Sequence, residues 1–93
     1  MLKLVNKVVS VNGRRTSLSM SDEVWRALQK ICGEEKISRN DLLSQIDNAK
    51  DKQMGLTQST RLFIICYLCH IAMNETGEDN KELMNMIFQS WKS

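Results

Sequence analysis

Residues 15–24 decide the fold of this chain, and they read Arg15-Thr16-Ser17-Leu18-Ser19-Met20-Ser21-Asp22-Glu23-Val24. Residues 16–20 form a short alternating pattern bounded by Gly13 and Ser21, which predicts a β-strand. Ser21 is then followed by two acidic residues. This predicts the start of a helix, because serine caps free N–H groups and acids favour the positive end of the helix dipole. The strand has an inner face of Thr16, Leu18 and Met20, and an outer face of Arg15, Ser17 and Ser19.

Two amphipathic helices are expected after this strand. The first begins after Ser21 and ends near Gly33. The second begins at Ser38, with Asp41 at the spacing of a capping box, and frays in the polar segment 47–55. Their expected buried positions are Val24, Leu28 and Ile31 in the first helix, and Leu42, Leu43 and Ile46 in the second.

Two more helices are expected in the C-terminal part. The third begins near Thr57 or Ser59 and runs to about Thr76. Because it is apolar on most sides, we expect it to be a central buried helix. Gly77 ends it, and Asp79 opens the last helix.

The composition fits one small, mainly helical domain. The chain has 93 residues, of which 42% are hydrophobic, and a formal net charge of +2. We divide it into a basic extended segment 1–12, a core 13–50 and a C-terminal helical extension 56–91. Residues 1–16 carry cations and no acid, whereas acids gather in 75–82. This basic front favours contact with a polyanion; the alternative is that its cations only keep the segment soluble.

The short strand needs a partner, because its backbone N–H and C=O groups must be paired. Residues 5–11 are also extended, but we find no obvious tight turn that would fold them back onto the strand. A second copy of the chain, related by a two-fold axis, is then the economical partner. The sequence therefore predicts a homodimer with one short strand per chain and an intersubunit two-stranded antiparallel ribbon. Its expected dimer core is Thr16, Leu18, Met20, Val24, Leu28, Leu42, Leu43 and Ile46.

A ribbon of this kind suits DNA. A two-stranded ribbon fits the major groove of B-DNA, which is about 12 Å wide. Arg15 can donate two hydrogen bonds to guanine, and Ser17 and Ser19 are small enough to approach a base edge. The alternative interpretation of these three residues is an ordinary solvated strand face.

The residues that follow strengthen this interpretation through a resemblance. Arg15–Leu28 (R-T-S-L-S-M-S-D-E-V-W-R-A-L), with Ser38-Arg39-Asn40-Asp41-Leu42-Leu43 after it, resembles the ribbon-helix-helix fold of the MetJ/Arc repressors. It is most similar to a bacterial subfamily with an R-T-S strand and a tryptophan in the first helix. In that subfamily a further helix begins with a pattern like that of residues 56–62. The similarity covers roughly residues 9–72.

The resemblance implies roles for six residues, and Arg14 is a further candidate beside them. Arg15, Ser17 and Ser19 would read bases, and Ser38, Arg39 and Asn40 at the start of the second helix would contact phosphate. Free N–H groups at a helix start favour an anion, although Ser38 alone is explained by capping. Arg14 would contact phosphate or simply flank a bend. Two serines among three readers depart from the better-known repressors and imply weak base discrimination.

The predicted function is therefore DNA binding by a homodimeric transcriptional regulator or repressor. The alternative is a dimeric, antitoxin- or adaptor-like interaction module that holds a protein partner through its C-terminal helices. The sequence contains no paired carboxylates in a plausible cleft, no glycine-rich phosphate loop and no serine nucleophile elbow, so we expect no enzyme.

Cys66, Cys69 and His70 form a C-x-x-C-H pattern, which is the attachment motif of c-type haem. It lies in an apolar helical run, and zinc held with Cys32 is the other option. Buried helical cysteines usually fill space, so we expect no cofactor and no metal. We find no secretory signal, and the apolar run Leu62–Met73 is roughly half of what a bilayer needs. A cytoplasmic protein with reduced cysteines and no membrane contact is expected.

Overall fold

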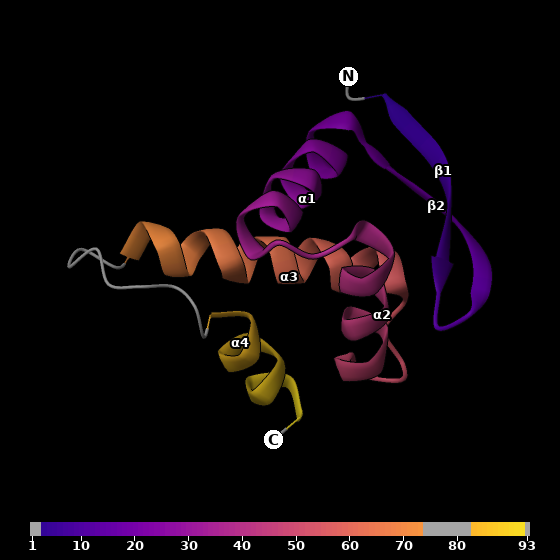
Figure 1. Ribbon diagram of the computed structural model, residues 1–93. Coiled ribbons are helices and arrows are strands. Elements are labelled where there is room, and N and C mark those ends of the chain that lie inside the picture. The colour runs from indigo at the N-terminus through magenta and orange to yellow at the C-terminus, as the bar shows by residue number, and fades with distance from the viewer. Residues whose placement is uncertain (1–2, 74–82, 93) are drawn as a thin grey trace.

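The computed structural model describes residues 3–73 and 83–92. The elements follow in the order β1 (Leu4–Val11), β2 (Arg14–Ser21), α1 (Asp22–Glu35), α2 (Arg39–Ala49), α3 (Leu56–Met73) and α4 (Leu83–Lys92). Figure 1 shows α3 crossing the molecule, with α1 and α4 on opposite sides of it and the two strands beside α2. The chain is thus mostly helical, as predicted, with a two-stranded antiparallel sheet before the helices.

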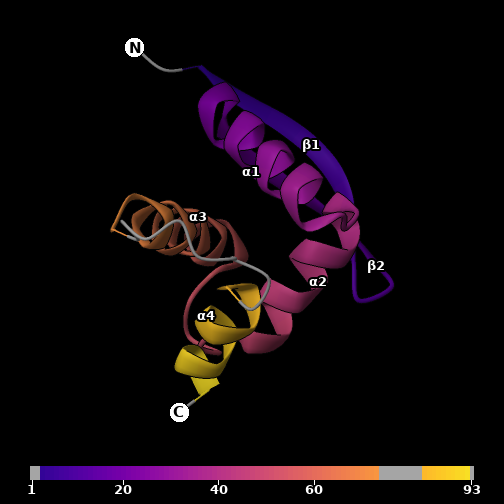
Figure 2. The ribbon, with the colours of Figure 1, turned by 60° about the vertical axis from the view of Figure 1, so that its left-hand side comes forward.

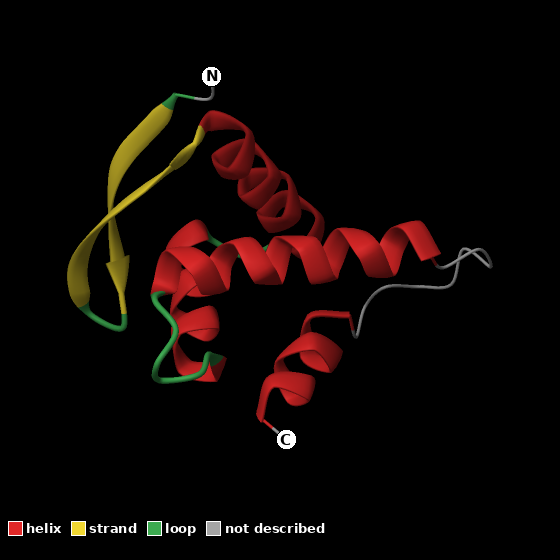
Figure 3. Cartoon of the chain, turned by 180° about the vertical axis from the view of Figure 1, so that it is seen from behind, coloured by secondary structure: helices red, strands yellow, loops and turns green. Residues whose placement is uncertain are grey.

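The partner of β2 is β1 of the same chain, so the prediction of one short strand without an intrachain partner is wrong. The hairpin closes at Val11 opposite Arg14. Asn12 and Gly13 connect the strands with φ of 52° and 80°. Two residues with positive φ form a type I′ turn, whose twist matches the strands, and Asn-Gly is its strongest sequence signal. Most of the predicted N-terminal arm 1–12 is therefore β1, and Figure 3 shows the twisted ribbon that results.

The hairpin turn is fixed to α2 by Asn12. The Asn12 backbone N–H donates to Ser44 Oγ at 2.9 Å. The Asn12 side-chain amide donates to Asp47 Oδ2 at 2.9 Å and to Asn48 Oδ1 at 3.0 Å. β1 lies against α2, beside α1 in the view of Figure 2. The hairpin is therefore held by its own chain.

The core lies under the inner face of the hairpin. Among the predicted core residues, Leu18, Met20, Leu28, Leu42, Leu43 and Ile46 are buried. Thr16 and Val24 are only half-buried, and Trp25 is buried next to Val24 instead. β1 adds Val9 and Val11, which are 3% and 1% exposed. One chain thus supplies the strand and helix contacts that were expected from two copies.

Both predicted N-caps are present in the structure. Ser21 Oγ accepts from the N–H of Val24 at 3.3 Å, and Ser38 Oγ accepts from the N–H of Asp41 at 3.1 Å. Each cap satisfies an N–H group that has no partner inside its own helix. α1 and α2 begin directly after these serines, as expected from the sequence.

α3 is not the fully buried central helix that was expected. Its inner face carries the buried Phe63 and Tyr67, while Ile65 and Leu68 on the outer face are 57% and 49% exposed. α4 covers part of the inner side, with Phe88 stacked on Phe63 at 5.2 Å between ring centroids. The predicted end at Thr76 and the predicted start of the last helix at Asp79 lie outside the described residues.

α3 extends beyond the apolar run 62–73 on which the expectation from bilayer length rested. Its 18 residues have a mean hydropathy of 1.2, so by length and composition it is able to cross a membrane. This is weak evidence, since the core helix of a soluble protein meets the same criterion.

Candidate nucleic-acid interface

The outer face of the hairpin brings the predicted base-reading residues together. The register places Ser10, Val8 and Asn6 of β1 opposite Arg15, Ser17 and Ser19 of β2. Side chains at these positions point away from the core, because alternate residues of a strand face opposite sides. Arg15 and Ser17 are exposed, and Ser19 is half-buried. The predicted strand face therefore exists, and β1 contributes half of it.

Asn6 connects two of the predicted readers. Ser17 Oγ donates to Asn6 Oδ1 at 2.6 Å, and Asn6 Nδ2 donates to Ser19 Oγ at 2.9 Å. Asn6 and Ser19 are directly opposite, whereas Ser17 is a diagonal neighbour that the Asn6 side chain reaches across the ribbon. The two serines are thus held in one hydrogen-bonded group.

The edge of β2 that faces away from β1 has unpaired backbone groups. Ser10 N–H donates to Asn40 Oδ1 at 3.2 Å, so it points away from β2. Hydrogen-bonded and non-hydrogen-bonded pairs alternate in an antiparallel ladder. Ser10–Arg15 and the next outward pair, Val8–Ser17, are therefore non-hydrogen-bonded, and the N–H groups of Arg15 and Ser17 point away from β1. These two N–H groups therefore have no acceptor in the β1–β2 ladder.

The three predicted phosphate contacts on α2 have different surroundings. Ser38 Oγ caps the helix through the N–H of Asp41. Asn40 Oδ1 accepts from the Ser10 N–H, which joins the start of α2 to the edge of β1. Arg39 lies over the indole ring of Trp25, with its guanidinium carbon 5.5 Å from the ring centroid. Of these three predicted contacts, only Arg39 brings a positive charge to the N-terminus of α2.

Two cations lie beside the Trp25 ring at the start of α2. Lys7 Nζ lies 5.5 Å from the ring centroid of Trp25, as the Arg39 guanidinium does. The Trp25 indole N–H donates to the Val5 carbonyl at 2.9 Å, which fixes the ring against β1. No Asp or Glu of the described ranges forms an ion pair with Lys7 or Arg39. The site therefore has two uncompensated positive charges beside free helix N–H groups, a combination that favours an anion.

Arg39 Nε is buried and has no hydrogen-bond partner among the described residues. A buried donor without a partner is costly. The neighbouring Trp25 ring restricts the arginine side chain, so less side-chain entropy is lost when an anion binds.

A second group of cations surrounds the hairpin tip. Arg14, Arg15 and Lys50 line a surface hollow together with Asp47. The Arg14 guanidinium is 3.9 Å from the Asp47 carboxylate, and its side chain is 76% exposed, so this ion pair is weak. Arg14 is thus positioned by the turn and still accessible to solvent.

Four useful residues were not found from the sequence. Asn6, Lys7 and Lys50 lacked a local motif, because their neighbours are distant in sequence. Asn12 did carry a signal: Asn12-Gly13 between two alternating segments indicates a hairpin. With that turn recognised, the register would have placed Asn6 opposite Ser19.

The cysteines do not assemble a metal site. Over residues 3–73 and 83–92, no group of three or more His, Cys, Asp or Glu side chains is arranged to hold a metal ion. Burial raises the pKa of the Cys32 thiol, and burial followed by the proximity of Cys69 raises that of Cys66. Thiols with raised pKa values are poor nucleophiles at neutral pH.

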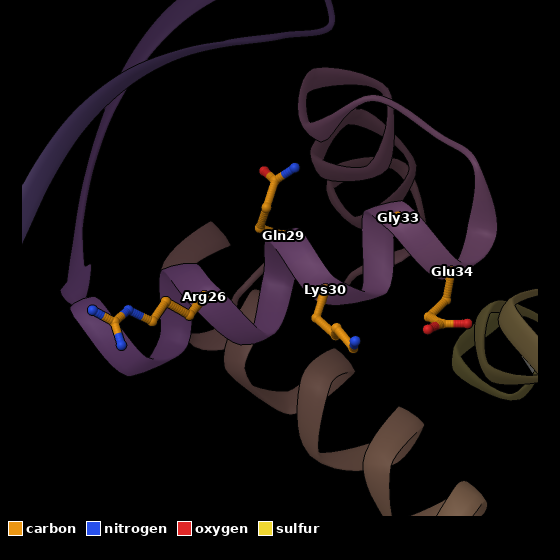
Figure 4. A pocket seen from close by; sticks show the side chains of 5 residues that line it. All are labelled: Arg26, Gln29, Lys30, Gly33 and Glu34. Atoms are coloured by element: carbon orange, nitrogen blue, oxygen red, sulfur yellow. The ribbon is translucent and has the colours of Figure 1, made fainter.

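A groove along the outer face of α1 lies away from the hairpin residues. Figure 4 shows its lining side chains, Arg26, Gln29, Lys30 and Glu34 with Gly33, spread along one helix. They include no pair of groups with acid–base or nucleophilic geometry. Arg26 forms a 2.8 Å ion pair with Asp22 within the same helix.

Comparison with known proteins agrees with this arrangement. A family model described as a ribbon-helix-helix domain matches residues 4–68, which contain the hairpin, α1, α2 and most of α3. No curated protein and no solved structure matches the chain significantly. Proteins of this family are typically DNA-binding transcription regulators and are generally not enzymes. By its hairpin, its two capped helices and this match, the chain belongs to the ribbon-helix-helix domain family.

Proposed function

We propose that this protein is a homodimeric transcription regulator that binds the major groove of DNA with the outer face of its β-ribbon. The observation that carries the proposal is the polar face of Arg15, Ser17 and Ser19, joined by Asn6 and flanked by cations. Arg15 donates to guanine, and the serines approach base edges. Proteins of this family are usually soluble and cytoplasmic, and we propose the same location here.

Phosphate contacts flank the ribbon in this proposal. Arg39 and Lys7 bind one phosphate region beside the start of α2, and Arg14 with Lys50 binds another at the hairpin tip. Ser38 and Asn40 hold the N-terminus of α2 beside β1 and present its N–H groups. These contacts position the protein on DNA without reading sequence, whereas the ribbon face supplies the preference for bases.

The dimer forms through the open edge of β2. The outward N–H groups of Arg15 and Ser17 pair with the same strand of a second copy, which gives the strand order β1–β2–β2–β1. The two β2 strands are then about 4.8 Å apart, and the outer strands about 14 Å. Because the groove is about 12 Å wide, the central β2 pair enters it and the β1 strands lie at its margins.

The DNA-binding test compares Arg15→Ala with Arg26→Ala on genomic fragments, by gel shift at two salt concentrations. Both changes remove one exposed arginine, but Arg26 lies on the outer face of α1. We expect Arg15→Ala to weaken binding about 10-fold and to relax sequence preference, and Arg26→Ala to have little effect. Equal DNA binding by the two variants would contradict the assignment of the ribbon face as the DNA-binding surface.

The dimer test uses proline on the strand edge. Ser17→Pro removes an N–H group that faces away from β1, so the hairpin and its circular dichroism spectrum are retained. We expect sedimentation equilibrium to show a dimer for the wild type and a monomer for Ser17→Pro. Thr16→Pro is the matched control, because Thr16 forms a hydrogen-bonded pair with Val9 and its loss opens the hairpin itself. A dimeric Ser17→Pro variant would exclude the β2 edge.

A second candidate function is an interaction module that binds an amphipathic helix of a partner protein on the outer face of α3. It is favoured by the exposure of Ile65 and Leu68. α3 carries Arg61 and contains no Asp or Glu, so the complementary helix is acidic. Ile65→Gln with Leu68→Gln should abolish that binding and leave DNA binding intact. If both changes reduce DNA binding instead, α3 belongs to the DNA-binding dimer.

A further inference from the structure

We infer that Asn6 is a base-reading residue, with adenine as its target. This inference rests on the proposed DNA-binding function and deepens it. Asn6 lies on β1, outside the strand whose sequence predicted DNA contacts, and its exposed side chain is held over β2 by Ser17 and Ser19.

The Asn6 amide lies between the two serines, with its oxygen toward Ser17 and its nitrogen toward Ser19. Ser17 Oγ approaches Asn6 Oδ1 at 2.6 Å, and Ser19 Oγ approaches Asn6 Nδ2 at 2.9 Å. The amide oxygen can only accept and the amide nitrogen can only donate. With Ser17 as donor and Ser19 as acceptor, the oxygen lies on the Ser17 side and the nitrogen on the Ser19 side.

This group leaves hydrogen-bonding capacity free for a ligand. Asn6 Oδ1 retains a second lone pair, and Asn6 Nδ2 retains its second hydrogen. Among residues 3–73 and 83–92, no other protein group occupies these two positions. The amide therefore has one acceptor position and one donor position left for a ligand.

Adenine has the complementary edge in the major groove. Its N6 amino group donates and its N7 accepts, and asparagine binds the two together as a bidentate pair. Here the adenine amino group would face the Ser17 side, and N7 would face the Ser19 side. Guanine offers two acceptors at this edge, and cytosine offers a lone donor, so neither satisfies both atoms of the amide.

The restrained Asn6 side chain compensates for the small serine readers. A serine hydroxyl rotates and accepts or donates, so it discriminates little between bases. Once Ser17 and Ser19 are engaged by Asn6, their hydroxyls restrain a side chain that does discriminate. Arg15 is then one specific reader and Asn6 the other, each on a different strand of the hairpin.

Selection from a randomised duplex pool tests this assignment, with the full chain and the variants Asn6→Ala, Asn6→Asp and Asn6→Gln. We expect the wild type to select adenine at one position. Asn6→Ala should lose that preference and bind the selected site about 10-fold more weakly, and Asn6→Gln should retain adenine. Asn6→Asp should change the preference to cytosine, because a carboxylate accepts from the cytosine N4 amino group.

Ser10→Ala is the matched control, because Ser10 lies on the same strand and the same face, opposite Arg15. It should leave the adenine position unchanged. Thermal unfolding of every variant shows whether the hairpin is kept. Asn6→Asp tests the role without shortening the side chain.

The outcomes distinguish a wrong role for Asn6 from a wrong proposed function. An adenine preference that Asn6→Ala removes and Asn6→Asp changes to cytosine supports the assignment. DNA binding whose base preferences are identical in the wild type, Asn6→Ala and Asn6→Asp overturns the role of Asn6 and leaves the proposed function in place. Relaxed preference in Asn6→Asp without cytosine selection also overturns base reading, because Asn6 then only positions the serines. Absence of DNA binding by the wild type overturns the proposed function itself.

Discussion

The indole N–H of Trp25 donates a 2.9 Å hydrogen bond to the carbonyl of Val5, and so joins the first helix to the first strand. The same ring lies under Lys7 and Arg39. Because of this bond, one aromatic residue both attaches the hairpin to the core and positions two cations at the start of α2. Trp25 therefore connects the hairpin to the proposed phosphate site.

Replacement of Trp25 by phenylalanine tests the contribution of this hydrogen bond. A smaller aromatic ring is retained, but the Val5 carbonyl loses its indole donor, so we expect the free energy of unfolding to fall by about 1–3 kcal/mol. Trp25→Ala also removes the buried ring and should cost about 3–5 kcal/mol. Urea denaturation followed by circular dichroism measures both. Equal loss in the two variants would show that the bond, and not the ring, dominates.

The hairpin turn depends on the positive φ of Gly13. Gly13→Ala adds a Cβ that meets no atom within 4 Å, so its cost comes from the backbone conformation alone. We expect a loss of about 1–2 kcal/mol. Gly33→Ala is the control, since Gly33 lies inside α1 and its added Cβ also meets no atom. That change should stabilise the protein by about 0.5–1 kcal/mol, and a loss of stability there would contradict the account.

Tyr67 predicts a decline in stability at alkaline pH. Burial, a hydrogen bond from its hydroxyl to Glu35 and the negative charge of that residue raise the Tyr67 pKa well above its usual value near 10. The native state then keeps a proton that the unfolded state releases, so stability is lost as the pH rises through about 10. The decline in the free energy of unfolding above this pH should be smaller in Tyr67→Phe. Parallel pH curves for the two proteins would contradict this assignment.

Arg39 should contribute to DNA affinity without contributing to specificity. Its guanidinium lies at the start of α2, away from the reading face, where a phosphate is expected. Arg39→Ala should weaken binding similarly on all sequences. The slope of log K against log salt should decrease in magnitude by about 0.9 for one lost phosphate contact. Fluorescence anisotropy over a salt series measures this. A change confined to one DNA sequence would assign Arg39 to base reading instead.

The sequence predicted the helices well because their signals are local. Ser21 and Ser38 cap α1 and α2 as expected, and the apolar positions of both helices are mostly buried. The burial of α3 was overestimated, because an apolar composition does not tell which neighbours cover a helix. Its exposed Ile65 and Leu68 became apparent only from packing.

The predicted site was incomplete because half of it comes from β1. Arg15, Ser17 and Ser19 were identified through alternation along one strand, and the structure places them on one face. Asn6 joins them through a register that depends on the turn at Asn12 and Gly13. Lys7 and Arg39 meet at Trp25, although their separation in sequence is large. Such contacts depend on tertiary structure and have no periodic signal.

The most direct test of the central claim is nuclear magnetic resonance of the isotopically labelled full chain during titration with duplex DNA. We expect the largest chemical-shift changes at the side-chain amide of Asn6 and at the backbone amides of Arg15, Ser17 and Ser19. The outer faces of α1 and α3 should change little. Changes concentrated on either helix face, with an unchanged hairpin, would contradict the claim that the outer face of the ribbon binds DNA.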